Sequence, residues 1–539
     1  MKLTHSYKQS PVTEPYDVIM IGSGIGGLTA AALLTKAGKR VLVLERHYTA
    51  GGFTHMFKRK DYEWDVGIHY LGEVHHPSSV LAQVFDYLSD GQLQWADMGA
   101  VYDKIIFGDE VYDFRTGIEE FKGQLKEYFP DRADQEAIDA YVQLVFDVAK
   151  ASGSYFAARA IPKVGRFLFG ALMRRGLNKI ASQTTRQVLE GITKNEKLIG
   201  VLTGQYGDYG LPPAQSSFAM HAMVAKHYFR GGSYPVGGST RIFDTIAPLI
   251  INGGGAIYTN ADVKEIIVEG NKATGVRLAD GVTIKAPMVI SSAGIMNTYN
   301  HLIPQAVSEK AGFPQQMREL TPSSGHLSLY IGLKHTAEEL GIDKPNLWIY
   351  PANYNHDENL ARFMADENEP LPVVYISFPG AKDPEFTTRF PGRTTIEIIT
   401  IAPYERFAEW DGSRWKHRGE EYDAYKEKLS QRLLEYLYKY VPQTKGKVDY
   451  YELSTPLTTK HFINYQHGEI YGIDHTPDRF AKKFLLPETP IKGLYLTGQD
   501  IVTAGVGGAL FGGVITASAI LQKNLIKGIL EDRAKVAKG

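Results

Sequence analysis

The 539-residue sequence contains no cysteine. This absence excludes disulfide bridges, thiolate metal sites, a redox-active Cys-x-x-Cys pair and a cysteinyl bond to a cofactor. A chain without cysteine is compatible with a reducing compartment. We therefore expect a cytoplasmic protein, possibly held peripherally on a membrane surface.

Long apolar runs and an excess of one charge are also absent. The sequence has no run of about 18 apolar residues, which a spanning helix needs, and residues 1–14 are mostly polar, unlike a signal peptide. The formal net charge is −1 and no region is strongly basic, so nucleic acid is not an expected partner. The length suggests two or three domains with enough chain to bury a core.

A strand, a glycine cluster, a helix and a second strand follow one another near the N-terminus. The apolar run at 17–21 leads into glycines within 22–27, a helix is expected over 28–37, and a second strand over 41–44 ends before Glu45. This order is typical of a dinucleotide-binding β-α-β unit. The alternative is a glycine-rich turn with no ligand.

The glycines of this unit have separate roles. Gly22 permits the tight turn, Gly24 lets the backbone approach a pyrophosphate, and Gly27, with Gly26 beside it, allows close helix–strand packing. Free N–H groups at the start of the helix would face the phosphates. Glu45 can accept hydrogen bonds from ribose hydroxyls. We count all five residues as candidate cofactor-binding residues.

Further motifs indicate which dinucleotide is bound. Arg46 is followed by the pair Gly51-Gly52, and Gly67-Ile68-His69-Tyr70 comes shortly after. Near the C-terminus, Gly498-Gln499-Asp500 precedes a segment of small residues that includes Val506 and Gly507. These motifs, with the run from 16 to 72, resemble the retinol saturase branch of the phytoene desaturase and amine oxidase superfamily, to which the carotenoid isomerases are related.

The resemblance implies FAD as the cofactor. Gly51 and Gly52 would let the chain pass along the ribityl and pyrophosphate groups, and the backbone near Val263 would hold the adenine. Asp500, next to Gly498, would contact the ribityl or pyrophosphate, although it could also, or only, cap the following helix. The start of that helix, at Val506 and Gly507, would point at the flavin pyrimidine ring.

The expected fold class is α/β. A Rossmann-like FAD-binding domain of the glutathione reductase type, three-layered with a β-meander, is combined with an α+β substrate domain and a helical lid. The expected meander strands lie at 262–269, 273–278 and 282–285, and one helix is expected to run from the C-terminal motif to about residue 529. The domains are expected at 14–80, 228–304 and 486–539 (FAD-binding), 305–485 with strands from 81–115 (substrate-binding), and 116–227 (lid).

Residues 151–189 contain no acidic residue but several lysines and arginines interleaved with aromatic and aliphatic residues. Such a basic amphipathic segment suits the headgroup layer of an anionic membrane. We therefore predict peripheral membrane contact here. The alternative is a packed lid helix with a solvated basic face.

The resemblance implies hydride chemistry by the flavin, so the protein must supply a proton. His69 is the first candidate and Tyr70 the second, although a structural role for the histidine is an alternative. His461, His467 and Tyr471 form a weaker candidate for substrate contact. No metal site is expected, and without a second nucleotide motif the electrons would come from another protein or from transient NAD(P)H.

The leading functional hypothesis is an FAD-dependent oxidoreductase that saturates a carbon–carbon double bond in an apolar polyene, such as a retinoid or carotenoid. One alternative is a redox-neutral carotenoid isomerase, or a desaturase or isomerase of carotenoids or unsaturated fatty acyl chains. An alternative of another class is a non-catalytic prenyl-lipid escort protein.

Overall fold

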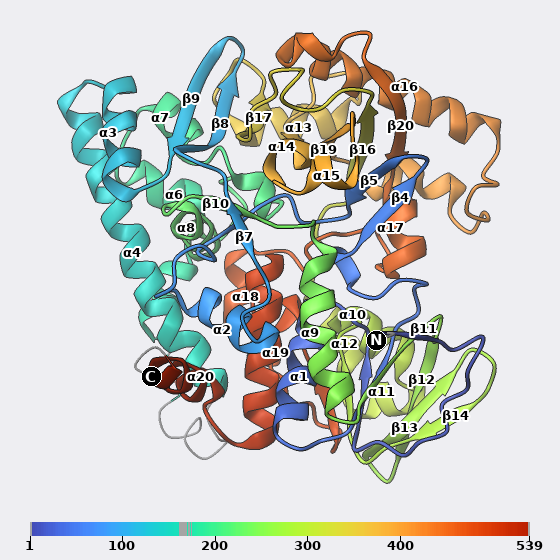
Figure 1. The fold of residues 1–539 in the computed structure, drawn as a ribbon. Helices are drawn as coiled ribbons and strands as arrows, with labels where there is room; N and C mark the ends of the chain where they lie inside the picture. The colour runs from blue at the N-terminus through green and yellow to red at the C-terminus, as the bar shows by residue number, and fades with distance from the viewer. Residues whose placement is uncertain (1–2, 161–169, 171–172, 174, 537–539) are drawn as a thin grey trace.

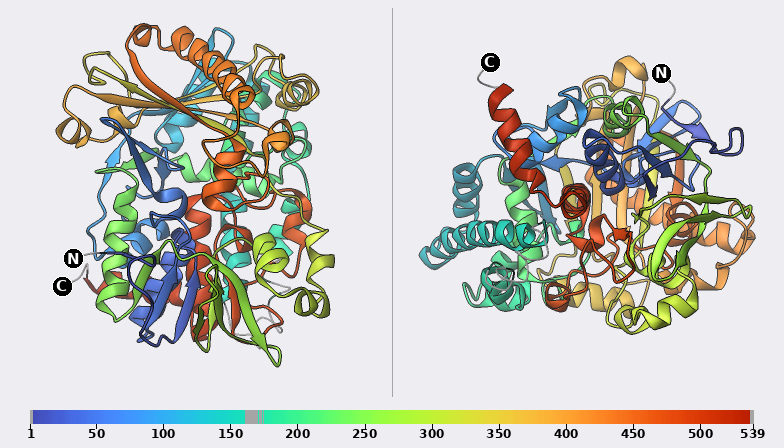
Figure 2. Two further views of the ribbon diagram at one scale, coloured as in Figure 1. Left: turned by 90° about the vertical axis from the view of Figure 1, so that its right-hand side faces the viewer. Right: turned by 90° about the horizontal axis from the view of Figure 1, so that it is seen from below.

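The structure is a computed structural model that describes residues 3–160, 170, 173 and 175–536 (Figure 1). Two sheets lie at opposite ends of the molecule, and a long helix runs down one side between them (Figures 1 and 2). The sheet at the bottom of Figure 1, called the lower sheet below, carries the dinucleotide motif. The cavity described below lies between the two ends.

The lower sheet has six parallel strands. Its strands in spatial order are β1 (His5–Ser6), β11 (Ala256–Thr259), β3 (Val41–Leu44), β2 (Val18–Ile21), β15 (Val289–Ser291) and β21 (Leu494–Leu496). Its central strands β2 and β3 are apolar and buried throughout, as expected where both faces of a parallel sheet are covered.

Alternate residues of β2 contribute to two different cores. Val18 and Met20 pack with the helices α1 (Ile25–Lys36), α9 (Thr240–Asn252) and α19 (Gly505–Leu521). Ile19 and Ile21 pack with the antiparallel meander β12 (Val263–Glu269), β13 (Lys272–Leu278) and β14 (Thr283–Lys285). Helices, sheet and meander therefore form three layers, which confirms the expected fold class.

Two strands of this sheet have no clear signal in the sequence. The two-residue strand β1 extends the sheet to residues before 14, and the four-residue strand β11 lies between β1 and β3. Both are too short to show an alternating pattern. Their pairing depends on contacts between residues far apart in the chain.

The upper sheet has seven strands, which are antiparallel except for the parallel pair β17 and β8. In spatial order they are β20 (Val448–Ser454), β16 (His326–Leu333), β19 (Thr394–Ile401), β18 (Val374–Ser377), β17 (Asn346–Tyr350), β8 (Val101–Phe107) and β9 (Glu110–Arg115). Helix α16 (Glu420–Tyr440) buries its apolar stripe against one face. The other face contributes Trp348 and Tyr375 to the core beneath the lid.

The helices of the segment predicted to form a lid, called the lid below, pack beside both sheets (Figure 1). Helix α4 extends to residue 160, past its expected end near residue 151, and packs on α8 and α19. Part of the predicted membrane segment, including Lys163, Arg166 and Arg174, lies outside the described residues. The lid helices are α3 (Ile118–Tyr128), α4 (Arg132–Ala160), α6 (Thr185–Glu190), α7 (Glu196–Leu202) and α8 (Phe218–Tyr228).

Shorter elements connect these parts. The small strands are β4 (Met56–Arg59), β5 (Tyr62–Asp65), β6 (Leu71–Gly72), β7 (Trp95–Asp97) and β10 (Gly232–Pro235). The remaining helices before the C-terminal segment are α2 (Val80–Ser89), α10 (Ile295–Asn297), α11 (Gln305–Lys310), α12 (Phe313–Met317), α13 (His356–Ala365), α14 (Pro379–Lys382), α15 (Phe386–Arg389), α17 (Pro456–Ile463) and α18 (Pro477–Ala481).

The prediction of one continuous C-terminal helix is wrong. Helix α19 ends at Leu521 because Gln522 adopts the left-handed conformation, and the chain turns by 108° into α20 (Leu525–Val536). Within the described residues no single helix is long and apolar enough to cross a membrane. Only α19 and α20, taken together as a bent pair, reach that length and composition.

Candidate functional site

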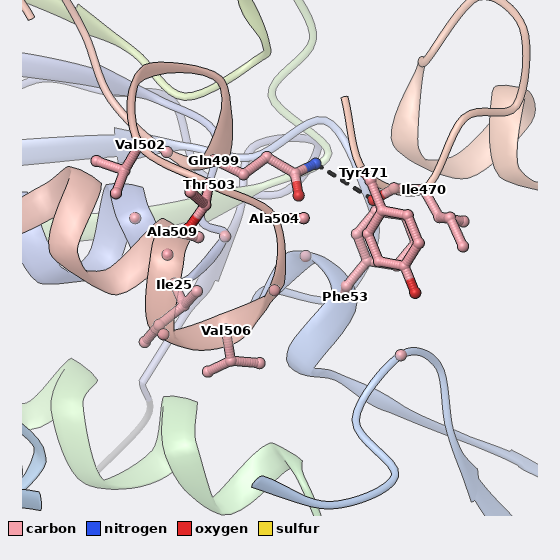
Figure 3. A pocket seen from close by; sticks show the side chains of 18 of the residues that line it. Ile25, Phe53, Ile470, Tyr471, Gln499, Val502, Thr503, Ala504, Val506 and Ala509 are labelled. Atoms are coloured by element: carbon pink, nitrogen blue, oxygen red, sulfur yellow. Dashed lines mark hydrogen bonds between the residues drawn. The ribbon is translucent and has the colours of Figure 1, made fainter. Parts of the chain in front are cut away.

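A cavity of about 1020 Å³ is lined by the glycine cluster, the start of α19, the lid and the upper sheet. This volume is at the upper end of the roughly 300–1,000 Å³ found for small-molecule and cofactor sites. Figure 3 shows the part of the cavity where Ile25 of α1 and Val506 of α19 lie near each other. The cavity thus joins the two motifs that the sequence places at opposite ends of the chain.

Two helices begin at the cavity wall without side-chain caps. Gly24 precedes α1 and Ala504 precedes α19, and neither helix has an acidic residue in its first turn. The first N–H groups of a helix lack partners within it, and its dipole is positive at this end. Both positions therefore favour negative charge, as a pyrophosphate or a reduced flavin ring carries.

The glycine loop leaves room for a ligand beside Gly24. A Cβ atom there would meet no atom within 4 Å, whereas a Cβ on Gly52 would lie 2.9 Å from the Cα of Gly24. Gly22 and Gly51 have φ angles of +91° and +119°, which side-chain-bearing residues rarely adopt. Gly52 thus packs against Gly24, and the loop leaves an open space beside Gly24, a cradle that a Cβ there would fill.

The neighbouring glycines are required for packing. A Cβ on Gly26 would lie 2.7 Å from the Cα of Gly498 and 2.8 Å from the carbonyl oxygen of Ala509. A Cβ on Gly27 would lie 2.6 Å from the carbonyl oxygen of Gly22. Gly26 therefore sets how closely α1 approaches α19, and Gly27 closes the turn as the motif predicts.

Glu45, Arg46 and Val263 all line the cavity, at the end where the adenosine of FAD is expected. Glu45 accepts hydrogen bonds from the N–H and Oγ of Ser23, at 3.0 and 2.7 Å, and from the N–H of His47. Arg46 Nη1 is buried without a hydrogen-bond partner among the described residues. This unsatisfied donor fits a polar group of a bound nucleotide.

Asp500 holds together the segments behind the cavity. Its Oδ2 accepts from the N–H of Ile295 at 2.8 Å, and its Oδ1 from the N–H of Ile473 at 3.2 Å. It does not cap α19, whose N-cap is Ala504, so the capping alternative is wrong. Asp500 and Gly498 line the cavity, as does Gly507, and their contacts with the cofactor stay predictions.

Two buried arginines fix the loop before α19. Arg479 donates to the carbonyl oxygens of Ile473 at 2.6 Å and Gln499 at 2.7 Å. Arg159 donates to the carbonyl of Ile501 and, at 2.7 Å, to the hydroxyl of Tyr155. Arg159 belongs to the basic segment at 151–189 that is predicted to contact a membrane, and no motif indicates that either arginine binds backbone carbonyls.

His69 lines the cavity and is paired with a buried acid. Its Nδ1 lies 2.7 Å from Oε2 of Glu397, whose side chain is fully buried. Burial lowers the pKa of His69 to about 4 and raises that of Glu397 to about 8. Sequence reasoning missed Glu397 because it sits within the expected strand at 394–400, far from His69 in the chain.

Tyr70 also lines the cavity, but its hydroxyl proton is engaged. The hydroxyl donates to Oδ2 of Asp103 at 2.8 Å and lies 3.2 Å from Oδ2 of Asp208. Burial and these two carboxyl groups raise the pKa of Tyr70 far above its usual value. Tyr70 is therefore a poor proton donor.

The weaker candidates do not form one site. His461 and His467 are exposed, and His461 stacks on Trp415, whereas Tyr471 lines the cavity and donates to the carbonyl of Gly207 at 2.8 Å. No group of three or more histidine, aspartate or glutamate side chains in the described part of the chain could hold a metal ion.

The rest of the cavity wall is mainly apolar and aromatic. It is formed by α4, α8 and the inner face of the upper sheet, which contribute Phe146, Phe156, Met220, Met223, Val224, Trp348, Tyr375, Ile399 and Ile401. Such a wall suits an apolar molecule and excludes water.

Comparisons with known proteins agree with this geometry. A family model described as "Flavin containing amine oxidoreductase" matches residues 25–320. An all-trans-retinol 13,14-reductase of Danio rerio is 37% identical, over 97% of this chain and 89% of its own. A chloroplastic prolycopene isomerase of Arabidopsis thaliana is 26% identical, over 94% of this chain and 82% of its own.

A solved oxidoreductase structure from Methanosarcina mazei has a TM-score of 0.61 to this chain at 19% identity. It covers 92% of this chain and 98% of its own, which shows a shared fold. The family model implies a flavin cofactor, which the cradle at Gly24 and the unsatisfied Nη1 of Arg46 accommodate. The chain belongs to the flavin-containing amine oxidoreductase family and, within it, to the retinol saturase-like branch.

Proposed function

We propose that this protein is an FAD-dependent oxidoreductase that adds two hydrogens across a carbon–carbon double bond of an apolar polyene, such as a retinoid or carotenoid. The observation that carries the proposal is one continuous cavity, lined in part by the dinucleotide glycines and in part by apolar lid side chains. The cofactor and the substrate would bind in this same cavity. The 37% identity to a named all-trans-retinol 13,14-reductase supports the same substrate class.

FAD is the flavin that we propose, because the cavity continues past the glycine cluster. Glu45, Arg46 and Val263 line that continuation, and an FMN molecule has no adenosine to occupy it. The unpaired Nη1 of Arg46 would then gain a partner.

Bound flavin supplies the hydride. The protein would bind and orient the cofactor and the substrate, and it would supply the proton. The start of α1 would hold the pyrophosphate, and the start of α19 would favour negative charge on the ring. The lid and upper sheet would keep water from the polyene, whose own double bonds offer no hydrogen-bonding groups.

His69 is the proposed proton donor. Its Nδ1 is buried against Glu397, whereas 15% of its side chain is exposed and the residue lines the cavity. The other ring nitrogen, Nε2, has no partner among the described contacts, and we propose that it faces the cavity. Because burial lowers the pKa of His69 to about 4 and keeps the ring neutral, the Nε2 N–H could protonate a substrate carbon only as Nδ1 takes up another proton.

The test is anaerobic incubation of the photoreduced protein with retinol, a carotenoid or an unsaturated fatty acid. Reoxidation of the flavin by a polyene, with a heavier product, supports the proposal. A rearranged product of unchanged mass would indicate an isomerase, and a protein purified without flavin absorbance would indicate a lipid escort. Failure of all three compounds to reoxidise the flavin contradicts the saturase proposal.

The source of electrons and the membrane contact are further proposals. We propose that electrons come from another protein or from transiently bound NAD(P)H, because one nucleotide motif is present. Peripheral contact with a membrane through 151–189 would let an apolar substrate enter the lid without crossing water. Its test is co-sedimentation with vesicles of anionic and of neutral lipid.

A further inference from the structure

Reduction of a carbon–carbon double bond needs a proton as well as a hydride. We propose that Glu397 is the proton reservoir for His69, so that the carboxyl proton moves to Nδ1 as Nε2–H protonates the substrate carbon. This inference rests on the proposed function. Glu397 is a positioning and relay residue, because it acts through His69.

The location of Glu397 is unusual for an acidic residue. It lies on β19, between β16 and β18, and its side chain is fully buried. Its Oε1 accepts from the N–H of Asp65 at 2.9 Å. Its Oε2 lies 2.7 Å from His69 Nδ1, in an ion-pair contact whose angle falls outside hydrogen-bond geometry, and neither atom has a hydrogen-bond partner in the described part of the chain. The pair is therefore exclusive.

A buried carboxylate without a bonded cation is costly. The nearby amine of Lys382 donates to the carbonyl of His69 at 2.9 Å and to the hydroxyl of Ser377 at 2.8 Å. No hydrogen bond or ion pair joins Lys382 to Glu397 among the described contacts. These contacts favour Glu397 as a neutral carboxylic acid, with the Lys382 amine nearby but not bonded to it.

The contact between Glu397 Oε2 and His69 Nδ1 determines where the proton of this pair can lie. A nitrogen and an oxygen 2.7 Å apart are close enough to exchange a proton after a small rotation of either side chain. When Glu397 holds that proton and donates it to Nδ1, Nε2 carries the N–H. A bound flavin would supply the hydride to one substrate carbon. The Nε2 proton would bond to the neighbouring carbon as the Glu397 proton moves to Nδ1, which leaves Glu397 as a carboxylate and His69 as a neutral imidazole.

The surrounding charges support this order of events. Burial raises the pKa of Glu397 to about 8 and lowers that of His69 to about 4, so the proton stays on the acid at neutral pH. The carboxylate that forms is stabilised by Lys382, whereas Asp65 opposes it. His326 also faces His69, and burial keeps it neutral by lowering its pKa to about 4. The pair titrates as one unit.

The first test is the rate at which polyene reoxidises photoreduced flavin, measured from pH 6 to 10. Wild type should slow as the pH rises past about 8, where the pair loses its transferable proton. Glu397→Gln keeps a donor to Nδ1 but cannot release a proton. We expect its rate to fall by about 100-fold or more and its alkaline decline to disappear, while Glu397→Asp restores part of both.

The matched control is Asp134→Asn, which neutralises a buried acid that lies in the lid and bonds Asn195 there. It should leave the rate and its pH dependence unchanged. An equal loss of rate in Asp134→Asn would show that Glu397→Gln slows the reaction by a general loss of structure and not through the relay. A wild-type rate and pH profile in Glu397→Gln would overturn the proposal.

The second test does not depend on turnover. In the apoprotein, ¹⁵N resonances of His69, assigned with His69→Asn, should show a proton on Nε2 at pH 7. They should show a shift of that proton to Nδ1 as the pH passes about 8, and no such change in Glu397→Gln. A proton on Nδ1 already at pH 7 overturns the relay. If wild type reduces no polyene, the proposed function is contradicted. The ¹⁵N titration of the apoprotein can still be interpreted in that case.

Discussion

Gly26 and Gly24 are two residues apart, yet the structure predicts different effects when each is replaced by alanine. At Gly26 the new Cβ would approach two backbone atoms, at 2.7 and 2.8 Å, that cannot move aside without separating α1 from α19. At Gly24 the new Cβ would meet no protein atom within 4 Å. It would instead fill the cradle expected to hold the pyrophosphate.

The magnitudes follow from these contacts. Overpacking costs about 1–3 kcal/mol, and two backbone overlaps place Gly26→Ala near ~3 kcal/mol. Alanine regains about 1 kcal/mol of helix propensity, which leaves a net cost of about 2 kcal/mol, or roughly 30-fold in an equilibrium constant. Gly24→Ala weakens only the start of α1, by no more than about 1 kcal/mol.

The assay is flavin titration of the apoprotein together with its melting temperature. Gly26→Ala should lower the melting temperature and weaken flavin binding, whereas Gly24→Ala should weaken flavin binding by at least about tenfold with little change in melting. Gly123→Ala, in an open position inside α3, is the control; it should preserve flavin affinity and raise the melting temperature slightly, because alanine gains about 1 kcal/mol of helix propensity there. Wild-type flavin affinity in Gly24→Ala, or wild-type melting in Gly26→Ala, would refute this reasoning.

Three further predictions concern other parts of the molecule. Arg46→Ala should weaken FAD binding by about tenfold, by loss of a charged hydrogen bond, and leave FMN binding unchanged; equal losses for both flavins would contradict the adenosine assignment. Arg479→Met removes the charged hydrogen bonds to the carbonyls of Ile473 and Gln499, of which Gln499 keeps only the bond from the N–H of Val502 at 3.3 Å; stability should therefore fall by about 3 kcal/mol and flavin content should drop, as urea unfolding and absorbance would measure. Burial lowers the pKa of His221 from 6.5 to about 3, so the stability it contributes is present above pH 6.5 and lost as the pH falls. The stability gap between wild type and His221→Gln should therefore narrow by ~2 kcal/mol between pH 6.5 and 5, and a constant gap in urea unfolding would contradict this.

The dinucleotide unit could be predicted from the sequence because its signals are local. A buried strand, a glycine cluster and a helix follow one another within about 30 residues, and β2, α1 and β3 lie where expected. The turn at Gly270 and Asn271 is equally local, and both residues have positive φ angles. Interactions between residues close in the sequence determine these elements.

The parts that could not be predicted depend on distant contacts. Glu397 looks like one polar residue in a strand, and its pairing with His69 appears only when the segment between β5 and β6 folds against the upper sheet. Arg159 and Arg479 bind backbone carbonyls, which no side-chain motif can indicate. The bend at Gln522 interrupts an apolar helix without glycine or proline at that position.

The central claim is that this flavoprotein delivers two hydrogens to a polyene double bond. Its most direct test is a single turnover of photoreduced protein with all-trans-retinol, without oxygen, followed by mass spectrometry of the extracted lipid. We predict one product molecule, heavier by two hydrogens, for each flavin reoxidised. A flavin that stays reduced while retinol is unchanged, or a product of unchanged mass, would contradict the account.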